Sequence, residues 1–266
     1  MSLKISLLCH NIDFKALSVL YYFCKKNNYP IDSIIIEESI NKKVINEPIT
    51  WKLLRKRYKP NLIKKIISKI LYFIRLENII SFFPESKYFK TISMKRAARK
   101  LKIPCYFVKN HSSEETKQIF ESRSINYALL ISSNYLIKDI LLKIPVKIIN
   151  AHCALLPKHR SLDSLPWSVI AKDKLGITTH FVDEGIDTGE ILLFEEIKPY
   201  QGDDLISFRR KMDEQIPAAL YQTIIKLEKN EITPQKQKLE DGIRHRIMTE
   251  EEFELAQKLF NQNYLG

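Results

Sequence analysis

Two segments in the second half of the chain bring together side chains that could do chemistry on a carbonyl group. Asn150 and His152 close an apolar run over residues 146–150, and Asp187 follows a second such run over residues 176–182. An amide can donate a hydrogen bond to an oxyanion, an imidazole can transfer protons near neutral pH, and a carboxylate can orient that imidazole. The three residue types therefore predict a site that polarises a carbonyl and moves protons.

The segments that must position these residues alternate between two periodicities. Strands are expected over residues 4–9, 33–36, 104–108, 127–131, 146–150 and 176–182, with 190–195 returning as a hairpin. Helices are expected over residues 14–26, 87–102, 112–123, 136–143, 166–172 and 203–229. This alternation predicts an α/β fold with a doubly wound, mostly parallel sheet, in which ligands collect beyond the carboxyl ends of the strands.

Composition limits the class of protein. The chain has 266 residues, of which 45% are hydrophobic, so a full core is expected. The first ten residues lack the apolar length and the cleavage site of a signal peptide, and no run reaches the roughly 18 apolar residues of a membrane-spanning helix. The four cysteines have no paired spacing, which predicts reduced thiols in the cytoplasm and no metal site.

Glycine is absent from the first 175 residues, because all six glycines lie at or after Gly176. Dinucleotide-binding and P-loop motifs need glycine in the turn between a strand and a helix, where the backbone approaches phosphate groups. The chain is therefore a poor candidate for a nicotinamide enzyme or a P-loop kinase.

Positive charge is concentrated in one segment. The formal net charge is +12, and sixteen Lys or Arg residues lie between Lys52 and Lys102 against two Glu residues. Within this segment, residues 62–75 show an apolar helical face opposite a basic face, which predicts a basic helical insert over about 40–86. Its basic face is either solvated or docks to an anionic surface: the inner face of a membrane, a lipid-linked sugar or a nucleotide diphosphate. Its aromatic residues are not arranged to stack on bases, which disfavours nucleic acid.

The two polar segments resemble the formyltransferase family, whose members transfer a formyl group from N10-formyltetrahydrofolate to an amine. The resemblance spans about residues 103–193, with a weaker match over 4–36, and it includes the Leu-Leu-Pro-Lys run at residues 155–158. It implies that Asn150 hydrogen-bonds the formyl oxygen. It also implies that His152 stabilises the oxyanion and shuttles protons, while Asp187 orients His152 and accepts amine protons through water.

The resemblance implies further contacts. Those expected to bind the folate co-substrate are Ser133, Asn134, Tyr135, Leu136, Ile137 and Asp183. Those expected to bind the acceptor are His10, Leu156, Pro157, Lys158, Arg160 and Trp167. Two departures from the family pattern lie beside the site: Cys153-Ala154 stands where the family usually has Pro-Ser, and Ser161 stands where a glycine usually follows the arginine.

The acceptor is inferred by elimination. The resemblance divides the chain into a catalytic domain, residues 1–229, and a short extension, residues 230–266, of a kind that often pairs subunits into a homodimer. That extension is too short for the barrel of methionyl-tRNA formyltransferases, and residues 9–13 lack the glycines of glycinamide ribonucleotide formyltransferases. A nucleotide-linked amino sugar, as in lipopolysaccharide biosynthesis, is the expected acceptor.

Other functions are alternatives to this expectation. They are the two formyltransferase types just named and hydrolysis of the formyl donor by water. A further alternative is a binding module on this scaffold that is tethered to a membrane or to RNA.

Overall fold

The computed structural model describes residues 3–38, 89, 91, 93–133 and 137–265. The predicted basic insert over residues 40–86 lies outside the described residues. Residues 87, 88, 90 and 92 of the helix expected over 87–102 also lie outside the described residues, and the helix α5 covers Met94–Leu101, after the extended residue Ser93. Within the described ranges, no helix combines the length and the apolar character needed to cross a membrane.

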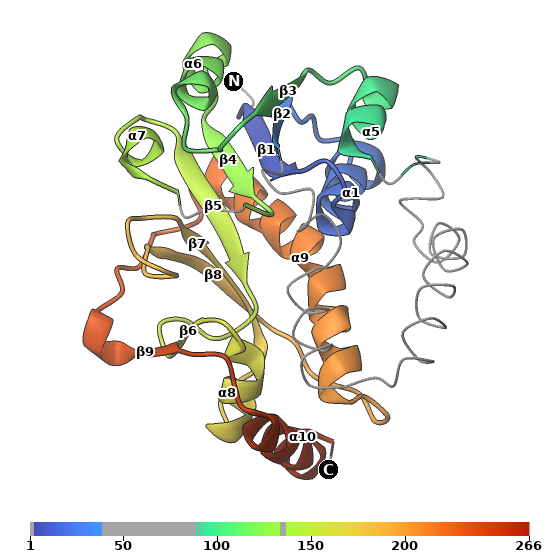
Figure 1. Cartoon of the computed structure of the whole chain (residues 1–266), viewed down its shortest axis with the longest axis vertical. Helices are drawn as coiled ribbons and strands as arrows, with labels where there is room; N and C mark the ends of the chain where they lie inside the picture. The colour runs from blue at the N-terminus through green and yellow to red at the C-terminus, as the bar shows by residue number, and fades with distance from the viewer. Residues whose placement is uncertain (1–2, 39–88, 90, 92, 134–136, 266) are drawn as a thin grey trace, which may run out of the picture.

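A seven-stranded sheet forms the centre of the molecule, in the order β3-β2-β1-β4-β5-β7-β8 (Figure 1). Its strands are β1 (Ile5–His10), β2 (Ser33–Glu37), β3 (Cys105–Val108), β4 (Tyr127–Leu130), β5 (Lys147–His152), β7 (Gly176–Phe181) and β8 (Ile191–Glu196). The strands from β3 to β5 are parallel, whereas β7 runs antiparallel to β5 and β8 antiparallel to β7. The mostly parallel sheet and the hairpin predicted from the sequence are both confirmed.

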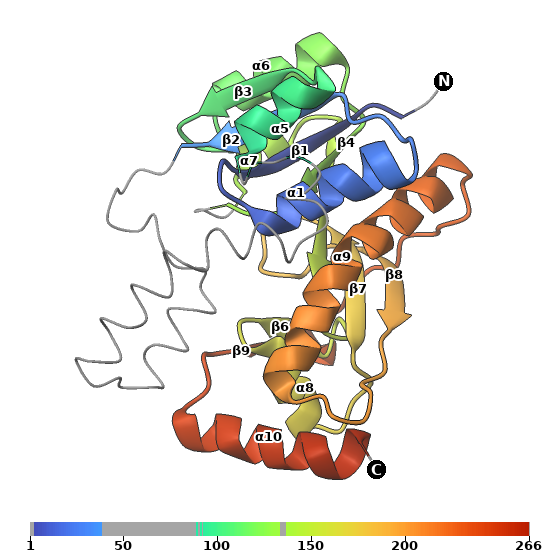
Figure 2. The same cartoon turned by 90° about the vertical axis from the view of Figure 1, so that its right-hand side faces the viewer.

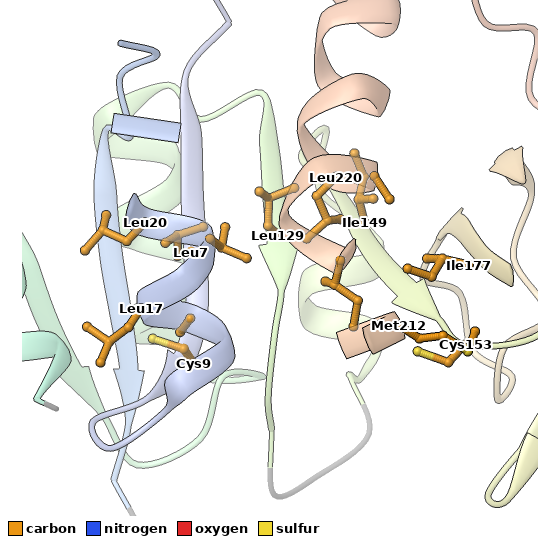
Figure 3. Packing of buried hydrophobic residues seen from close by; sticks show 14 of the residues in the cluster. Leu7, Cys9, Leu17, Leu20, Leu129, Ile149, Cys153, Ile177, Met212 and Leu220 are labelled. Atoms are coloured by element: carbon orange, nitrogen blue, oxygen red, sulfur yellow. The ribbon is translucent and has the colours of Figure 1, made fainter. Parts of the chain in front are cut away.

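Helices cover both faces of this sheet. One face packs against α1 (Phe14–Tyr21), α5 and α9 (Leu205–Glu228), and the other against α6 (Glu114–Arg123) and α7 (Asp139–Leu142). Neighbouring residues of a strand enter opposite layers, as Leu7 and Leu8 do, because side chains alternate along a strand. Figure 3 shows the α1 and α9 layer, with Leu7, Leu129 and Ile149 in one row of buried side chains.

Helix boundaries follow the capping chemistry of the chain. Ser113 caps α6 by accepting a hydrogen bond from the Thr116 amide. Asp204 and Ser207 form a capping box at the start of α9. The helix expected over residues 14–26 is split, because α1 continues as a π-helix over Tyr22–Lys26.

The C-terminal segment, residues 230–266, folds back onto the part of the chain that follows β5. Its strand β9 (Ile243–His245) pairs in parallel with the short strand β6 (His159–Ser161), and α10 (Glu250–Tyr264) packs on α8 (Ser164–Ile170) (Figures 1 and 2). Gly242 permits this approach, since a Cβ there would lie 1.6 Å from the Pro157 carbonyl oxygen. Ala256 and Phe260 of α10 belong to the same buried cluster as the sheet. The sequence interpretation had foreseen a short extension but neither of its elements.

Candidate active site

Asn150 and His152 occupy the carboxyl end of β5, two residues apart and therefore on one face of the sheet. Because β7 is antiparallel to β5, its residue His180 lies directly opposite Asn150. The loop after β7 places Asp187 in contact with both His152 and His180. The structure thus brings together all three residues that the sequence singled out for proton transfer and oxyanion stabilisation, and it adds His180.

The Asp187 carboxylate lies between two imidazoles. Its Oδ2 is 3.5 Å from His152 Nδ1 and its Oδ1 is 3.5 Å from His180 Nε2, while the Ser161 amide donates to Oδ2 at 2.8 Å. Burial alone would raise the pKa of Asp187. The contact with His180, the electrostatic interactions with both imidazoles and the Ser161 amide outweigh that effect and lower the pKa to about 2. Asp187 is therefore ionised at neutral pH.

Backbone carbonyls fix the tautomers of both histidines. A carbonyl oxygen can only accept, so His152 donates from Nε2 to the His159 oxygen at 2.8 Å. Neutral His152 then has its lone pair on Nδ1, facing Asp187. Burial lowers the pKa of His152, and Asp187 opposes that shift. A proton accepted at Nδ1 would form an imidazolium paired with Asp187.

The tautomer of His180 is fixed by a backbone carbonyl as well, and this histidine orients the amide of Asn150. Its Nδ1 donates to the Phe181 oxygen at 2.7 Å, so in the neutral form its Nε2 accepts from Asn150 Nδ2, 3.2 Å away. The second hydrogen of that amide group is not used by this contact. The arrangement supplies one oriented N–H donor, one proton acceptor and one fixed carboxylate within a single site.

A second histidine cluster adjoins the site through the His159 carbonyl. His159 contacts Asp173 Oδ2 through Nε2 and His245 Nε2 through Nδ1, both at 2.9 Å. The ring of His245 is stacked between His159 and Trp167, with centroid distances of 5.1 and 4.8 Å. Burial lowers the pKa of His159, while burial and then His159 lower that of His245 to about 4. Lys158 forms an ion pair with Asp173.

The residues expected to bind the acceptor occupy several places. Lys158 and Trp167 lie in this second cluster, and Trp167 Nε1 donates to the Arg246 carbonyl at 3.1 Å. Buried Leu156 donates its amide to Thr178 and is joined to Pro157 by a cis peptide bond.

Arg160 and His10 lie outside the second cluster. The Arg160 side chain is buried, and its hydrogen bonds run to residues 237–239 of the C-terminal segment. His10 ends β1, with Nε2 3.5 Å from the buried carboxylate of Glu37.

The residues expected to bind the folate are described only in part, because residues 134–136 lie outside the described ranges. Ser133 contacts Glu37 at 3.4 Å, and Ile137 is buried in the α6 and α7 layer. Asp183 accepts from the Gly185 amide at 3.0 Å and from the Thr188 hydroxyl at 2.6 Å, so it shapes the loop that carries Asp187. In the described part of the chain, no group of three or more His, Cys, Asp or Glu residues could hold a metal ion.

His180 was not singled out from the sequence, and Ser161 was singled out only as a departure from the family pattern. Both touch Asp187 in the structure. The signal for His180 was its place in the strand that pairs with β5, but the register that puts it opposite Asn150 cannot be read from the sequence pattern. Ser161 adopts a left-handed backbone with φ 75°, which is why glycine is the residue expected there.

Comparison with known proteins gives a consistent result. The profile of the formyl transferase family matches residues 85–224. A methionyl-tRNA formyltransferase from Caldanaerobacter subterraneus subsp. tengcongensis is 36% identical over 104 residues, which are 39% of this chain and 34% of that protein. One from Thermodesulfovibrio yellowstonii is 34% identical over 119 residues, 43% of this chain and 39% of that protein. The chain thus spans well under half the length of these relatives.

Solved structures share the fold at low sequence identity. A glycinamide ribonucleotide transformylase from Symbiobacterium toebii superposes with a TM-score of 0.57 at 14% identity, over 89% of this chain and 95% of that chain. A sugar N-formyltransferase from Shewanella sp. gives 0.56 at 16% identity, over 96% of this chain and 87% of that chain. Because the family profile covers more than half of the sequence, the chain belongs to the formyl transferase family.

Proposed function

We propose that this protein transfers the formyl group of N10-formyltetrahydrofolate to the amino group of a nucleotide-linked amino sugar. The observation that carries the reaction is the contact of one ionised carboxylate, Asp187, with His152, beside the oriented amide of Asn150. These are the groups that acyl transfer through a tetrahedral oxyanion requires.

The reaction divides among the three residues as follows. The amine nitrogen bonds to the formyl carbon, and the formyl oxygen takes the negative charge. The free N–H of Asn150 donates to that oxygen. His152 accepts the proton lost by the amine on Nδ1, and Asp187 stabilises the resulting imidazolium. The bond from carbon to N10 of the folate then breaks, the proton passes from His152 to the leaving nitrogen, and formamide and tetrahydrofolate result.

Recognition of the folate is proposed to use mainly backbone groups after β4. The side chain of Asp183 is occupied within its own loop, and that of Ile137 is buried in the core. Backbone donors and acceptors therefore remain as the means of binding the pterin ring, with Ser133 at the edge of the sheet. Asp183 contributes through the shape of the loop.

The acceptor is argued from the loop after β1. The start of a helix binds phosphate through its free N–H groups. In α1 the Asp13 carboxylate takes that place, since its Oδ1 accepts from the Ala16 amide at 3.0 Å and its Oδ2 from the Ser132 hydroxyl. A phosphate bound there would face a carboxylate. This disfavours glycinamide ribonucleotide and leaves an acceptor that binds its phosphates elsewhere.

Two sets of relatives support different acceptors. The sugar N-formyltransferase from Shewanella aligns over 96% of this chain, including the C-terminal segment, which supports an amino sugar. The curated relatives at 36% and 34% identity are methionyl-tRNA formyltransferases, which makes methionyl-tRNA the second candidate acceptor.

A panel of acceptors separates these candidates. The protein is incubated with formyl-folate and nucleotide-linked amino sugars, glycinamide ribonucleotide or methionyl-tRNA, and tetrahydrofolate release is followed with product mass. Formylated amino sugar is the expected product, and the variant D187N serves as the inactive control. Formylation of methionyl-tRNA alone would replace the proposed acceptor. Release of formate in the absence of any acceptor would indicate hydrolysis.

The basic segment over residues 52–102 is proposed to attract the anionic part of the acceptor. Its described portion exposes Lys95, Arg96 and Arg99 on α5. Attraction between exposed charges weakens with salt. We expect the KM for a nucleotide-linked acceptor to rise with ionic strength. Co-sedimentation with anionic vesicles would instead assign the segment to a membrane surface.

Pairing of subunits through residues 230–266 also stays a prediction. The inner face of α10 already packs within its own chain, so a partner would contact the outer face. Light scattering of the purified protein tests it.

A further inference from the structure

One side chain of the C-terminal segment connects the loop that carries Asp187 to the strand β6, which contacts His152. Gln237 Nε2 donates to the Asp187 carbonyl at 3.1 Å and to the Gly189 carbonyl at 2.6 Å. Its Oε1 accepts from Arg160 Nη2 at 3.3 Å and Nε at 3.4 Å. A single amide therefore joins the loop of Asp187 to strand β6.

Strand β6 is the other half of this arrangement. The carbonyl of His159 receives the hydrogen bond of His152, and the amide of Ser161 donates to the Asp187 carboxylate. Arg160 lies between these two residues with only 3% of its surface exposed. It donates further to the carbonyls of Lys238 at 2.9 Å and Leu239 at 3.1 Å, so β6 is bound to the C-terminal segment at its centre.

The loop of Asp187 needs such support. Asp187 has a φ of 56°, a left-handed conformation that costs free energy in a residue other than glycine. The chain on either side of Gln237 is also fixed, because Gln235 pairs with Ile191 at the start of β8 and β9 pairs with β6. These pairings fix the backbone of Gln237, so its side chain can stabilise the strained loop of Asp187.

We propose that Gln237 is a positioning residue, which fixes Asp187 at contact distance from His152. It touches neither reacting group and acts through the backbone of the Asp187 loop. This inference rests on the proposed roles of His152 and Asp187 in formyl transfer. It gives the C-terminal segment a part in the active site of its own chain.

The substitution Q237M tests the proposal, because methionine keeps the length of the side chain and removes both kinds of hydrogen bond. Q235M is the matched control, since the side chain of Gln235 is exposed and its pairing with Ile191 uses only the backbone. We expect kcat of Q237M to fall by on the order of 10²-fold, with the KM for formyl-folate little changed, because misplacing a catalytic group mainly affects the transition state. Q235M should retain wild-type kcat.

Two readouts separate positioning from a loss of folding. Asp187 raises the pKa of His152, so displacing Asp187 should lower the His152 midpoint in an NMR titration of Q237M but not of Q235M. In a D187N background, Q237M should cost little further activity, because its effect passes through Asp187. An unchanged His152 titration, or the same fold-loss with and without Asp187, would overturn the proposal.

A second variant decides the matter if Q237M does not fold. Q237E still accepts from Arg160 but, when ionised, cannot donate to the two carbonyls. Protonation restores one donor, so the activity of Q237E relative to wild type should rise as the pH falls, and a ratio independent of pH would contradict the proposal. The NMR titration needs no substrate. A shifted His152 midpoint without turnover of any acceptor would therefore reject the proposed function and leave the positioning role intact.

Discussion

Two neighbouring clusters in this molecule contain the same groups, two imidazoles and one carboxylate, in different orders. In the candidate active site, Asp187 lies between His152 and His180, 3.5 Å from each. In the second cluster, His159 lies between Asp173 and His245, so the two imidazoles touch at 2.9 Å. The shared carbonyl of His159 places the clusters side by side.

The order of the groups decides what each cluster does with a proton. A proton on His152 faces a carboxylate that, in the described part of the chain, no lysine or arginine neutralises. A proton on His245 faces a second imidazole, and the carboxylate beyond that imidazole is already paired with Lys158. Asp187 raises the proton affinity of His152 against the effect of burial. In the second cluster, burial and then His159 lower the pKa of His245 to about 4, and the cluster joins β9 to β6 and α8.

The largest difference is expected on removing the carboxylates. D187N leaves the carboxamide oxygen for the Ser161 amide but removes the charge that stabilises protonated His152. We expect kcat to fall by about 10²- to 10⁴-fold, the range of general acid–base contributions. The matched change D173N should leave kcat within about 3-fold, because Asp173 contacts no reacting group. Steady-state kinetics measure kcat of both variants, and an equal loss of kcat in the two would contradict the proposed difference between the clusters.

The next largest effect concerns the terminal imidazole of each cluster. H180Q removes the group that holds both Asn150 and Asp187, so we expect kcat to fall by on the order of 10-fold, the effect of one net hydrogen bond of about 1.4 kcal/mol. H245Q should leave kcat unchanged and lower the free energy of unfolding by about 0.5–1.5 kcal/mol, because an aromatic stack is lost. Denaturant unfolding and steady-state kinetics measure the free energy of unfolding and the kcat of both variants. A kinetic defect in H245Q would show that the second cluster also serves catalysis.

Sequence alone predicted the parallel part of the fold and its three central polar residues. Alternating periodicity defined the strands from β1 to β5, and the Leu-Leu-Pro run between His152 and Asp187 distinguished these residues from ordinary turn residues. The antiparallel entry of β7 could not be derived, because a buried strand has the same apolar pattern in either direction. The contacts of His180 depend on that register.

In the C-terminal segment, α10 could have been predicted from the sequence, whereas β9 could not. Thr249 and Glu252 form a capping box before Phe253, Ala256 and Phe260, which have helical spacing, so α10 could have been predicted. Strand β9 has three residues, too few for a periodicity, and its partner β6 also has three. The bridging role of Gln237 depends on that pairing and on the loop of Asp187, neither of which local pattern specifies.

Acid unfolding should separate the contribution of His245 from that of Asp187 along the pH axis. The folded-state pKa values of His159 and His245 lie below the ordinary 6.5, so their neutral forms stabilise the fold fully above that pH. This stability is lost as the pH falls from 6.5 towards about 4. Asp187, with its pKa lowered from 3.8 to about 2, contributes stability that is lost only below about pH 4. We expect H245Q to flatten the upper part of the curve of unfolding free energy against pH, and D187N the lower part. Flattening of both parts by one variant would contradict the separation.

The smallest effect is expected on replacing Lys158, which pairs with the carboxylate of the second cluster. K158M removes the charge that neutralises Asp173, while the apolar stem is largely retained. The Lys158 side chain is 52% exposed, so the loss of stability should stay below about 1 kcal/mol. The pKa of His159 should nevertheless rise, because Asp173 then acts on it unopposed. Since Trp167 stacks on His245, its fluorescence reports the protonation of this cluster, and its titration midpoint should move to higher pH. If the midpoint stayed in place, the ion pair would not be what sets the proton affinity of the second cluster.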